Sequence, residues 1–306
     1  MALRIAALCL SAAGLLGASP AAQLVLLDED FDAGLPPGWT TDQEGVFQGD
    51  DWTVGFGQVN GSGDMNHEWY CTGGNSSRNN RLVSPALDLS GLANIVLEFD
   101  QFHLEMGGLL GPNKYNRVEV SVDFGAWNQI YDVPESPAPD GFSSVALSLN
   151  AYAGQSHVRI GFHYRGSVAT DWSVDDVRVT AVWHDVGQGL GGSFGTPDLN
   201  GLGDLEVGAP MGISLTGAAP ASAAYLVVGF AELGLPFYGG TLVPAFEPPL
   251  GTFFPLSTNG AGGLSLGSTW PAGVPSGSVM TLQCWVVDAG APFGLSASNA
   301  VRGHVP

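Results

Sequence analysis

The chain of 306 residues is predicted to be all-β, a jelly-roll antiparallel β-sandwich followed by a second, smaller β-sandwich. It contains 45 Gly and 20 Pro, residues that destabilise helix interiors by about 1 and 3 kcal/mol relative to Ala. Apolar and polar residues alternate in short runs, and turn-rich segments separate the runs, a pattern typical of strands. The hydrophobic content of 45% is enough apolar surface for a folded core.

The predicted first domain, residues 23–184, alternates most clearly in its middle. In RVEVSVD the side chains of Val118, Val120 and Val122 share one face, while Glu119 and Ser121 face away. This spacing predicts a strand with one wet side. Many such strands, with the first and last far apart in the sequence, favour a two-sheet antiparallel sandwich. The runs cover residues 25–31, 52–54, 95–104, 117–123, 145–149, 158–164 and 172–182.

The second domain follows a glycine-dominated segment in which the apolar alternation stops. We predict a linker over residues 185–205 and a compact β-sandwich over residues 206–306. Glycine or proline punctuates nearly every short apolar run of the second domain, as expected for strands joined by tight turns.

Residues 1–22 have the pattern of a secretory signal peptide. Arg4 opens a short charged start, a moderately apolar stretch follows from Ile5 to Leu16, and small residues precede Gln23. A membrane anchor needs about 18 to 20 unbroken apolar residues, and glycine and serine interrupt this run. We therefore expect cleavage near Ala22 and a protein that is secreted or held at the cell surface.

Two cysteines, Cys71 and Cys284, remain after the predicted cleavage. In an exported protein they could form one disulfide. They could equally be two unlinked, packed cysteines. The sequence leaves both possibilities open.

The charge excludes one class of partner. The net charge is -20, and nine Lys and Arg residues cannot build the cationic stripe that nucleic acids or anionic membranes require. Residues 23–184 carry -15 of this charge and residues 185–306 carry -6. We expect a partner that is neutral, cationic or a metal, and no transmembrane segment.

Four segments of the first domain carry a family resemblance: residues 26–40 (LLDEDFDAGLPPGWT), 81–102, 117–123 and 157–179. In this order they resemble the choice-of-anchor J or cleaved-adhesin family, whose domains are jelly-roll sandwiches related to MAM-type modules. The resemblance implies a noncatalytic extracellular module for adhesion or ligand binding. Residues 206–306 resemble an uncharacterised module of exported planctomycete-type bacterial proteins, which implies no particular chemistry.

The family resemblance also implies calcium, which binds six to eight oxygen ligands. The first and last strands of a jelly roll are commonly neighbours, so carboxylates on both would lie close together and favour a cation. Alternatively, these carboxylates lie on solvated strand ends and pair with Arg178 or Arg159. The positions that match the family's motifs are Glu29, Asp32, Asp175 and Asp176.

Aromatic residues are the remaining indication of a ligand. Trp69 and Tyr70 lie in the polar stretch NHEWYCTGGN, and exposed rings can stack on sugars or peptide groups. Trp39 and Trp172 match family positions and are expected in the core. We therefore interpret Trp69 and Tyr70 as the candidate ligand-binding residues.

No catalytic machinery is identified in the sequence, which contains no H-E-x-x-H pair. Paired carboxylates could still cleave glycosides if they flanked a cleft. The leading hypothesis is an exported noncatalytic binding or adhesion protein, with a jelly roll that calcium stabilises and that binds an extracellular glycan or protein. The alternatives are a structural envelope or matrix protein without a specific ligand, and a glycoside hydrolase.

Overall fold

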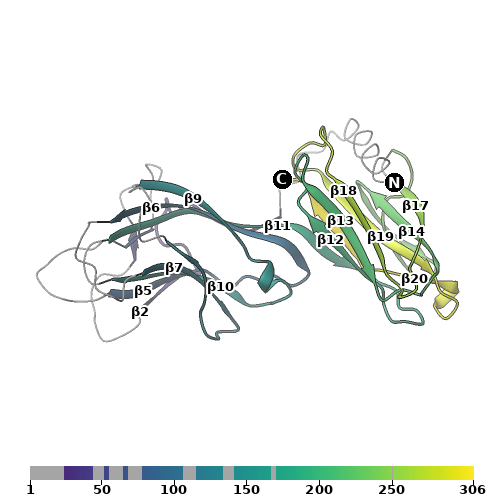
Figure 1. Ribbon diagram of the computed structural model, residues 1–306, viewed down its shortest axis with the longest axis horizontal. Helices are drawn as coiled ribbons and strands as arrows, with labels where there is room; N and C mark the ends of the chain where they lie inside the picture. Colours follow the sequence, from purple (N-terminus) through teal and green to yellow (C-terminus); the bar gives the residue numbers. More distant parts are fainter. Residues whose placement is uncertain are drawn as a thin grey trace, which may run out of the picture. The chain divides into compact units, whose positions relative to one another are not determined.

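The computed structural model describes residues 24–43, 52–54, 65–67, 78–105, 115–133, 141–166, 170–249 and 251–306. The described residues contain no α-helix, and their only helical pieces are two short 3₁₀ turns, η1 (Asn150–Tyr152) and η2 (Pro292–Gly294). The prediction of an all-β sandwich protein is therefore confirmed. The chain divides into two compact units (Figure 1). The N-terminal unit comprises Val25–Ser90 and Val96–Thr180, and the C-terminal unit includes Gly91–Ile95 and Ala181–Pro306.

Two antiparallel layers make up the N-terminal unit. One is a five-stranded sheet in the order β2-β5-β10-β7-β8. In the other, β6 pairs with β9 and β11, and β11 also pairs with β1 and β4. Figure 1 shows β6 and β9 in one layer and β5, β7 and β10 in the other. The strands are β1 (Leu24–Glu29), β2 (Thr40–Gln43), β3 (Thr53–Val54), β4 (Met65–His67), β5 (Arg78–Val83), β6 (Leu92–Glu105), β7 (Tyr115–Val122), β8 (Asn128–Asp132), β9 (Gly141–Ser148), β10 (Val158–Gly166) and β11 (Thr170–Gly187).

The alternation in β7 has the predicted direction but a different outer face. Val118 and Val120 are fully buried in the core. Glu119 and Ser121 face the other way, yet they are only 7% and 0% exposed. The prediction of a wet face is wrong here, because arginine and aromatic side chains from neighbouring strands cover these polar groups.

The C-terminal unit also layers its strands. Its larger sheet has the order β17-β14-β19-β21, followed by the last residues of β11. A three-stranded sheet, β12-β13-β18, forms a second layer, and β15 and β16 form a separate hairpin. The strands are β12 (Asp198–Gly203), β13 (Pro210–Thr216), β14 (Ala223–Gly229), β15 (Glu232–Phe237), β16 (Gly240–Pro244), β17 (Gly251–Ser257), β18 (Leu264–Thr269), β19 (Val279–Val287), β20 (Leu295–Ala297) and β21 (Ala300–His304).

Cys284 belongs to the main core of the C-terminal unit. It is fully buried beside Leu226 and Leu282 in one apolar cluster. Burial raises the pKa of its thiol to about 12, and the cysteine is free. Of the two alternatives for Cys284, the unlinked packed cysteine is the one observed.

The structure differs from the predicted linker over residues 185–205. This segment contains β12, which pairs with β13 along its whole length. Leu199 and Leu205 are buried in the core of the C-terminal unit. A Cβ atom at Gly201 would collide with the indole of Trp183, so this glycine serves close packing. Glycine content alone does not distinguish such packing from a flexible linker.

Candidate functional site

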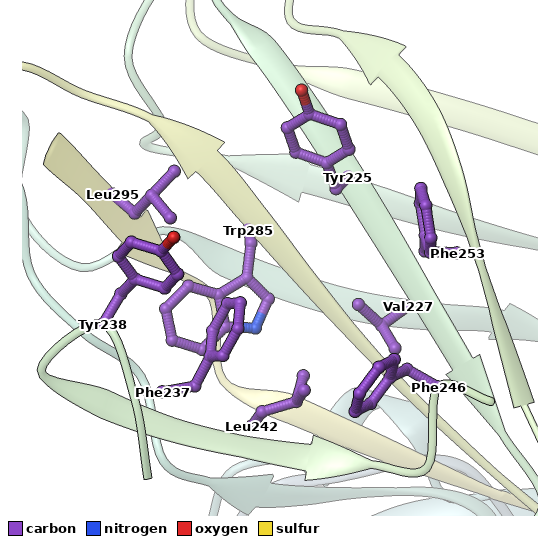
Figure 2. Close-up of a pocket in the computed structure, with 9 residues that line it drawn as sticks. All are labelled: Tyr225, Val227, Phe237, Tyr238, Leu242, Phe246, Phe253, Trp285 and Leu295. Atoms are coloured by element: carbon purple, nitrogen blue, oxygen red, sulfur yellow. The ribbon is translucent and has the colours of Figure 1, made fainter. Parts of the chain in front are cut away.

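The C-terminal unit contains a pocket of about 340 Å³ that is lined almost entirely by apolar side chains. The lining comes from the β15–β16 hairpin and from the outer face of β14, β17 and β19 (Figure 2). We call it the aromatic pocket. Its lining residues are Tyr225, Val227, Phe237, Tyr238, Leu242, Phe246, Phe253, Trp285 and Leu295.

Strand alternation explains why the pocket forms on this sheet. In β14, Leu226 and Val228 enter the main core of the unit, so Tyr225 and Val227 face outward. Alternation in β19 likewise turns Trp285 outward, opposite Tyr225 in the register. Both faces of this sheet are therefore apolar, and the outer face carries a second small cluster that contains Val227 and Trp285.

A buried glutamine fixes the hairpin above this face. Gln283 is 0% exposed. Its Nε2 donates hydrogen bonds to the carbonyl oxygens of Thr241 (3.0 Å) and Ser298 (3.2 Å). Its Oε1 accepts from the backbone N–H of Val243 (3.1 Å) and the indole N–H of Trp285 (3.2 Å). One side chain therefore ties β16 to β19 and also orients the tryptophan.

The rings form a buried floor and an exposed rim. Trp285 is 2% exposed, and Phe237 meets it edge-on with ring centroids 4.9 Å apart. Tyr225, Tyr238 and Phe253 are 38%, 53% and 55% exposed. Tyr238 lies at the hairpin turn with a φ of 42°, a conformation that costs a bulky residue free energy. The rim thus keeps aromatic surface in water where burial would be more favourable.

The pocket suits an apolar group. Its side-chain polar groups are the two tyrosine hydroxyls and the Trp285 indole N–H, and that N–H already donates to Gln283. A sugar needs several hydrogen-bond partners when it leaves water, whereas an aliphatic or aromatic side chain needs none. The sequence alone does not reveal this site, because the apolar runs of β14 and β19 are typical of any core strand. One signal was available in the sequence: in AAYLVVG and LQCWVVD, apolar residues occupy both faces of the strand and not one face alone.

The predicted metal ligands lie on neighbouring strands, since β1 pairs with β11 as expected. Asp175 is fully buried, and its Oδ1 accepts a hydrogen bond from the backbone N–H of Asp176 at 2.8 Å. Asp176 and Asp32 are exposed. Burial raises the pKa of Glu29, the Phe31 backbone N–H lowers it, and the charges of Asp30 and Asp28 raise it further; the net shift is upward.

In the described segments, no three His, Cys, Asp or Glu side chains gather as a metal site. Glu29, Asp32, Asp175 and Asp176 do not by themselves supply a calcium shell. Arg178 Nε lies 3.9 Å from Asp28 Oδ1, as the solvated-strand alternative expects for Arg178. Arg159 instead stacks on aromatic rings. Calcium stays a prediction.

Of the aromatic residues singled out in the sequence, two are core residues as predicted. Trp39 is 5% exposed and Trp172 is 0% exposed. Trp69 and Tyr70 lie outside the described residues, so their proposed ligand contact stays a prediction.

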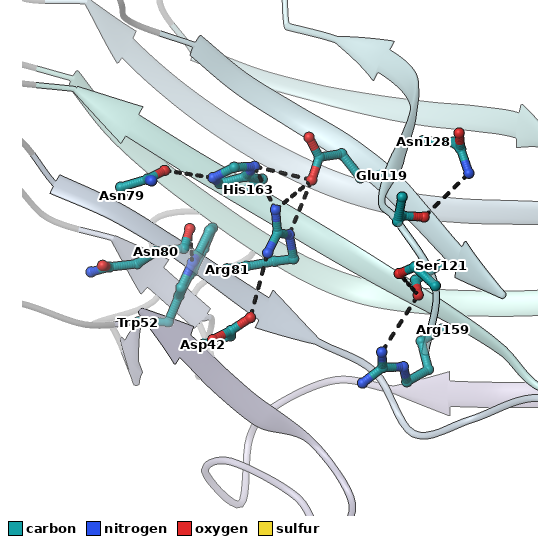
Figure 3. A network of polar contacts seen from close by, with 12 residues as sticks. Asp42, Trp52, Asn79, Asn80, Arg81, Glu119, Ser121, Asn128, Arg159 and His163 are labelled. Carbon is teal, nitrogen blue, oxygen red and sulfur yellow. Dashed lines mark hydrogen bonds and ion pairs between the residues drawn. The ribbon is translucent and has the colours of Figure 1, made fainter. Parts of the chain in front are cut away.

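The outer face of the five-stranded sheet carries a polar network (Figure 3). Arg81, 2% exposed, donates to Glu119 Oε2 from Nε (3.0 Å) and Nη2 (2.8 Å). His163 Nδ1 lies 3.0 Å from the same Glu119 oxygen, and its Nε2 lies 2.7 Å from Asn79 Oδ1. Burial alone would raise the pKa of Glu119, but His163 and Arg81 together outweigh it and lower that pKa. The carboxylate is therefore held in its charged form.

Comparisons with known proteins give only distant structural likenesses. No family model and no curated protein matches the chain. The chain is similar to the K3 and K1 cleaved adhesin domains of Lys-gingipain from Porphyromonas gingivalis W83, at 20% and 19% identity. These matches cover 51% of this chain and 98% and 97% of those chains, with TM-scores of 0.39 and 0.40. A xylan-binding CBM22-1 domain of Paenibacillus barcinonensis Xyn10C is 13% identical over 53% of this chain and 97% of that chain, with a TM-score of 0.28.

These TM-scores are low, so the likenesses carry no argument about activity. Cleaved adhesin domains do occur among the similar structures. The choice-of-anchor J resemblance and that of residues 206–306 stay predictions. In the part of the chain that the structure describes, no helix has the length and apolar character needed to cross a membrane.

Proposed function

We propose that this protein is an exported, noncatalytic binding protein whose aromatic pocket holds apolar side chains of an extracellular protein. The observation that carries the proposal is a preformed apolar pocket of about 340 Å³ with exposed aromatic residues on its rim. Ligand pockets in proteins fall between about 300 and 1,000 Å³, so this one suits one or two side chains. A purely structural protein would have no need to keep these rings exposed.

Rim aromatics are well suited to protein recognition. Tyr and Trp provide a large contact area, and such residues dominate the binding free energy of many interfaces. Tyr225 and Phe253 lie on adjacent strands with their ring centroids 6.3 Å apart. A ligand side chain inserted between the hairpin and the sheet would therefore contact both rings. Export, inferred from residues 1–22, places this pocket outside the cell.

The test is binding of the full mature chain to an array of extracellular proteins and peptides, with Phe253→Ala and Tyr225→Ala as variants. Both residues are exposed, so the variants should remain folded. Each should weaken capture by about tenfold or more, the loss expected for a hot-spot aromatic. Phe194→Ala is the matched control, because Phe194 is a 58% exposed phenylalanine of the same unit outside the pocket lining. Equal capture by all variants, or no capture by the unaltered chain, would contradict the proposal.

Calcium at the β1–β11 pairing is a separate part of the proposal, based on the family resemblance and on the neighbouring positions of these strands. A ligand that binds only the folded state raises the unfolding midpoint. We expect a higher midpoint in calcium than in chelator, and loss of that difference in Asp175→Asn. A midpoint that is the same in both buffers would remove calcium from the proposal without affecting the aromatic pocket.

A further inference from the structure

Two further aromatic rings, the exposed Phe124 and the half-buried Trp127, lie at the turn between β7 and β8 of the N-terminal unit. The Arg159 guanidinium carbon lies 4.5 Å from the ring centroid of Phe124 and 5.4 Å from that of Trp127. On the other strand neighbour of β10, Arg81 lies 4.4 Å from the same Trp127 ring. We call Phe124, Trp127 and Arg159 the arginine–aromatic platform.

A glycine makes this arrangement possible. Gly161 lies on β10, opposite Glu119 of β7 and Val83 of β5. A Cβ atom at Gly161 would lie 2.5 Å from Arg81 Cδ and 2.8 Å from Trp127 Cζ3. With no side chain at Gly161, Arg81 and Trp127 can lie across β10 and hold the platform in place.

Phe124 packs only on the surface, where its ring lies against His157 with ring centroids 4.7 Å apart. It is 70% exposed, so it contributes little to the core. Its φ is 58° and that of Asp123 is 49°, a pair of left-handed residues that hairpin turns normally fill with Asn, Asp or Gly. A bulky side chain in this region is strained, and such strain tends to persist at functional sites. At this position of the turn, glycine would adopt the backbone conformation at a lower free energy than the exposed phenylalanine does.

Arg159 supplies the charge of the platform. Its Nη2 lies 3.4 Å from Ser121 Oγ, and among the described residues it has no carboxylate partner. Its Nε is buried, so a ligand can reach only the terminal nitrogens. When a guanidinium stacks on an aromatic ring, its N–H donors still point outward in the guanidinium plane. There they can form two parallel hydrogen bonds with the two oxygens of a carboxylate.

The distribution of charge limits the size of the ligand. Four of the nine Lys and Arg residues, Arg81, Arg117, Arg159 and Arg165, lie on the outer face of this sheet. The whole chain, these four arginines included, has a net charge of -20, from which the sequence predicts a neutral or cationic partner; the outer face of this sheet departs from that average. A long polyanion would be repelled by the rest of the chain, whereas a short ligand stays within about one Debye length, 10 Å, of the arginines.

We propose that the arginine–aromatic platform binds a short acidic oligosaccharide, with the carboxylate of a uronic acid on Arg159 and the face of its sugar ring on Phe124. An acidic peptide could satisfy Arg159 alone. The flat, exposed ring beside the guanidinium favours a sugar, whose C–H face packs on aromatic surfaces.

The experiment is calorimetric titration of the full mature chain with tri-galacturonic acid, its methyl ester and tri-glutamate. We expect binding of the acid, and affinities lower by about tenfold or more for the methyl ester and for tri-glutamate. Arg159→Gln should lose the same factor. Arg165→Gln is the matched control, because Arg165 stacks on Tyr115 on the same face and lies outside the platform; it should bind unchanged.

Phe124→Gly separates binding from folding. Glycine suits a positive φ, so the unfolding midpoint should stay equal or rise while tri-galacturonate affinity falls. Retained affinity in Phe124→Gly, equal affinity for tri-glutamate, or no binding of tri-galacturonate would each overturn the proposal. None of these three results depends on the aromatic pocket, and Phe253→Ala should leave tri-galacturonate binding intact.

Discussion

Several buried polar side chains of this protein each depend on one particular partner. Arg81 and Glu119 form an ion pair on a sheet face that the alternation of β7 predicts to be wet, and both are almost completely buried. Charges removed from water are tolerated only when they are paired and hydrogen-bonded. Arg81, Glu119 and His163 meet that condition together, and Arg81 Nη1 also lies 3.5 Å from the exposed Asp42 carboxylate. Within the described part of the chain, removing Glu119 therefore leaves Arg81 with only a solvent-exposed carboxylate.

Glu119→Gln is expected to destabilise the N-terminal unit at pH 7, by about 3 kcal/mol, because it leaves Arg81 buried without its main carboxylate. The pKa of Glu119 is lowered from its ordinary value of 4.5 in the folded state. Its contribution to stability is therefore present above pH 4.5 and is lost as the pH falls through the folded-state pKa. The difference in unfolding free energy between the two proteins should shrink as the pH falls below 4.5. Urea unfolding across this range measures it.

The exposed Glu98 provides the control, and Glu98→Gln should change stability little at any pH. A Glu119→Gln protein as stable as the parent at neutral pH would contradict the expectation. So would a difference that stays constant as the solution is acidified.

At the scale of elements, the β15–β16 hairpin determines whether the aromatic pocket exists. Its pairing is irregular between Glu232 and Leu235, and it packs over the outer face of β19. Besides Gln283, an ion pair fixes it, since Arg302 donates to both carboxylate oxygens of Glu232 at 2.9 Å. The hairpin is thus held by polar groups at its base, while aromatic rings line the pocket beneath it.

Gln283→Leu is expected to loosen this hairpin. The change keeps the volume similar but leaves the carbonyls of Thr241 and Ser298 and the N–H of Val243 without partners, at about 1–3 kcal/mol each where water stays excluded. Hydrogen exchange should quicken in β15 and β16 and less in β13. Gln129→Leu, at an exposed position on β8, should change neither. Unaltered protection of the hairpin in Gln283→Leu would show that the ion pair alone suffices.

Some structural elements could be predicted from the sequence, and others could not. The valine spacing in β7 and the pairing of β1 with β11 follow from alternation and from fold resemblance, and both are present. The burial of Glu119 could not be predicted, because it depends on Arg81 and Trp127, which are distant in sequence and meet only across Gly161. The aromatic pocket was missed for a similar reason: strands β14 and β19 look like core strands until the hairpin that covers their second face is known.

At the scale of the whole molecule, charge is the dominant physical property. The chain has a net charge of -20 at pH 7 and few basic residues. Four of these basic residues lie on the outer face of the five-stranded sheet. Repulsion among like charges destabilises the compact state. The same charge keeps a protein with exposed aromatic rings soluble. The net charge therefore raises solubility while it lowers the stability of the folded state.

Salt should therefore stabilise this protein. Raising NaCl from about 20 to about 200 mM shortens the Debye length from about 20 Å to about 7 Å, which screens the repulsion. We expect the thermal midpoint at pH 7 to rise, and the gain to vanish near pH 4.2, where the net charge approaches zero. Chelator in every buffer prevents trace calcium from producing the same rise. A midpoint independent of salt at pH 7, or an equal gain at both pH values, would show that the carboxylates are already neutralised within the fold.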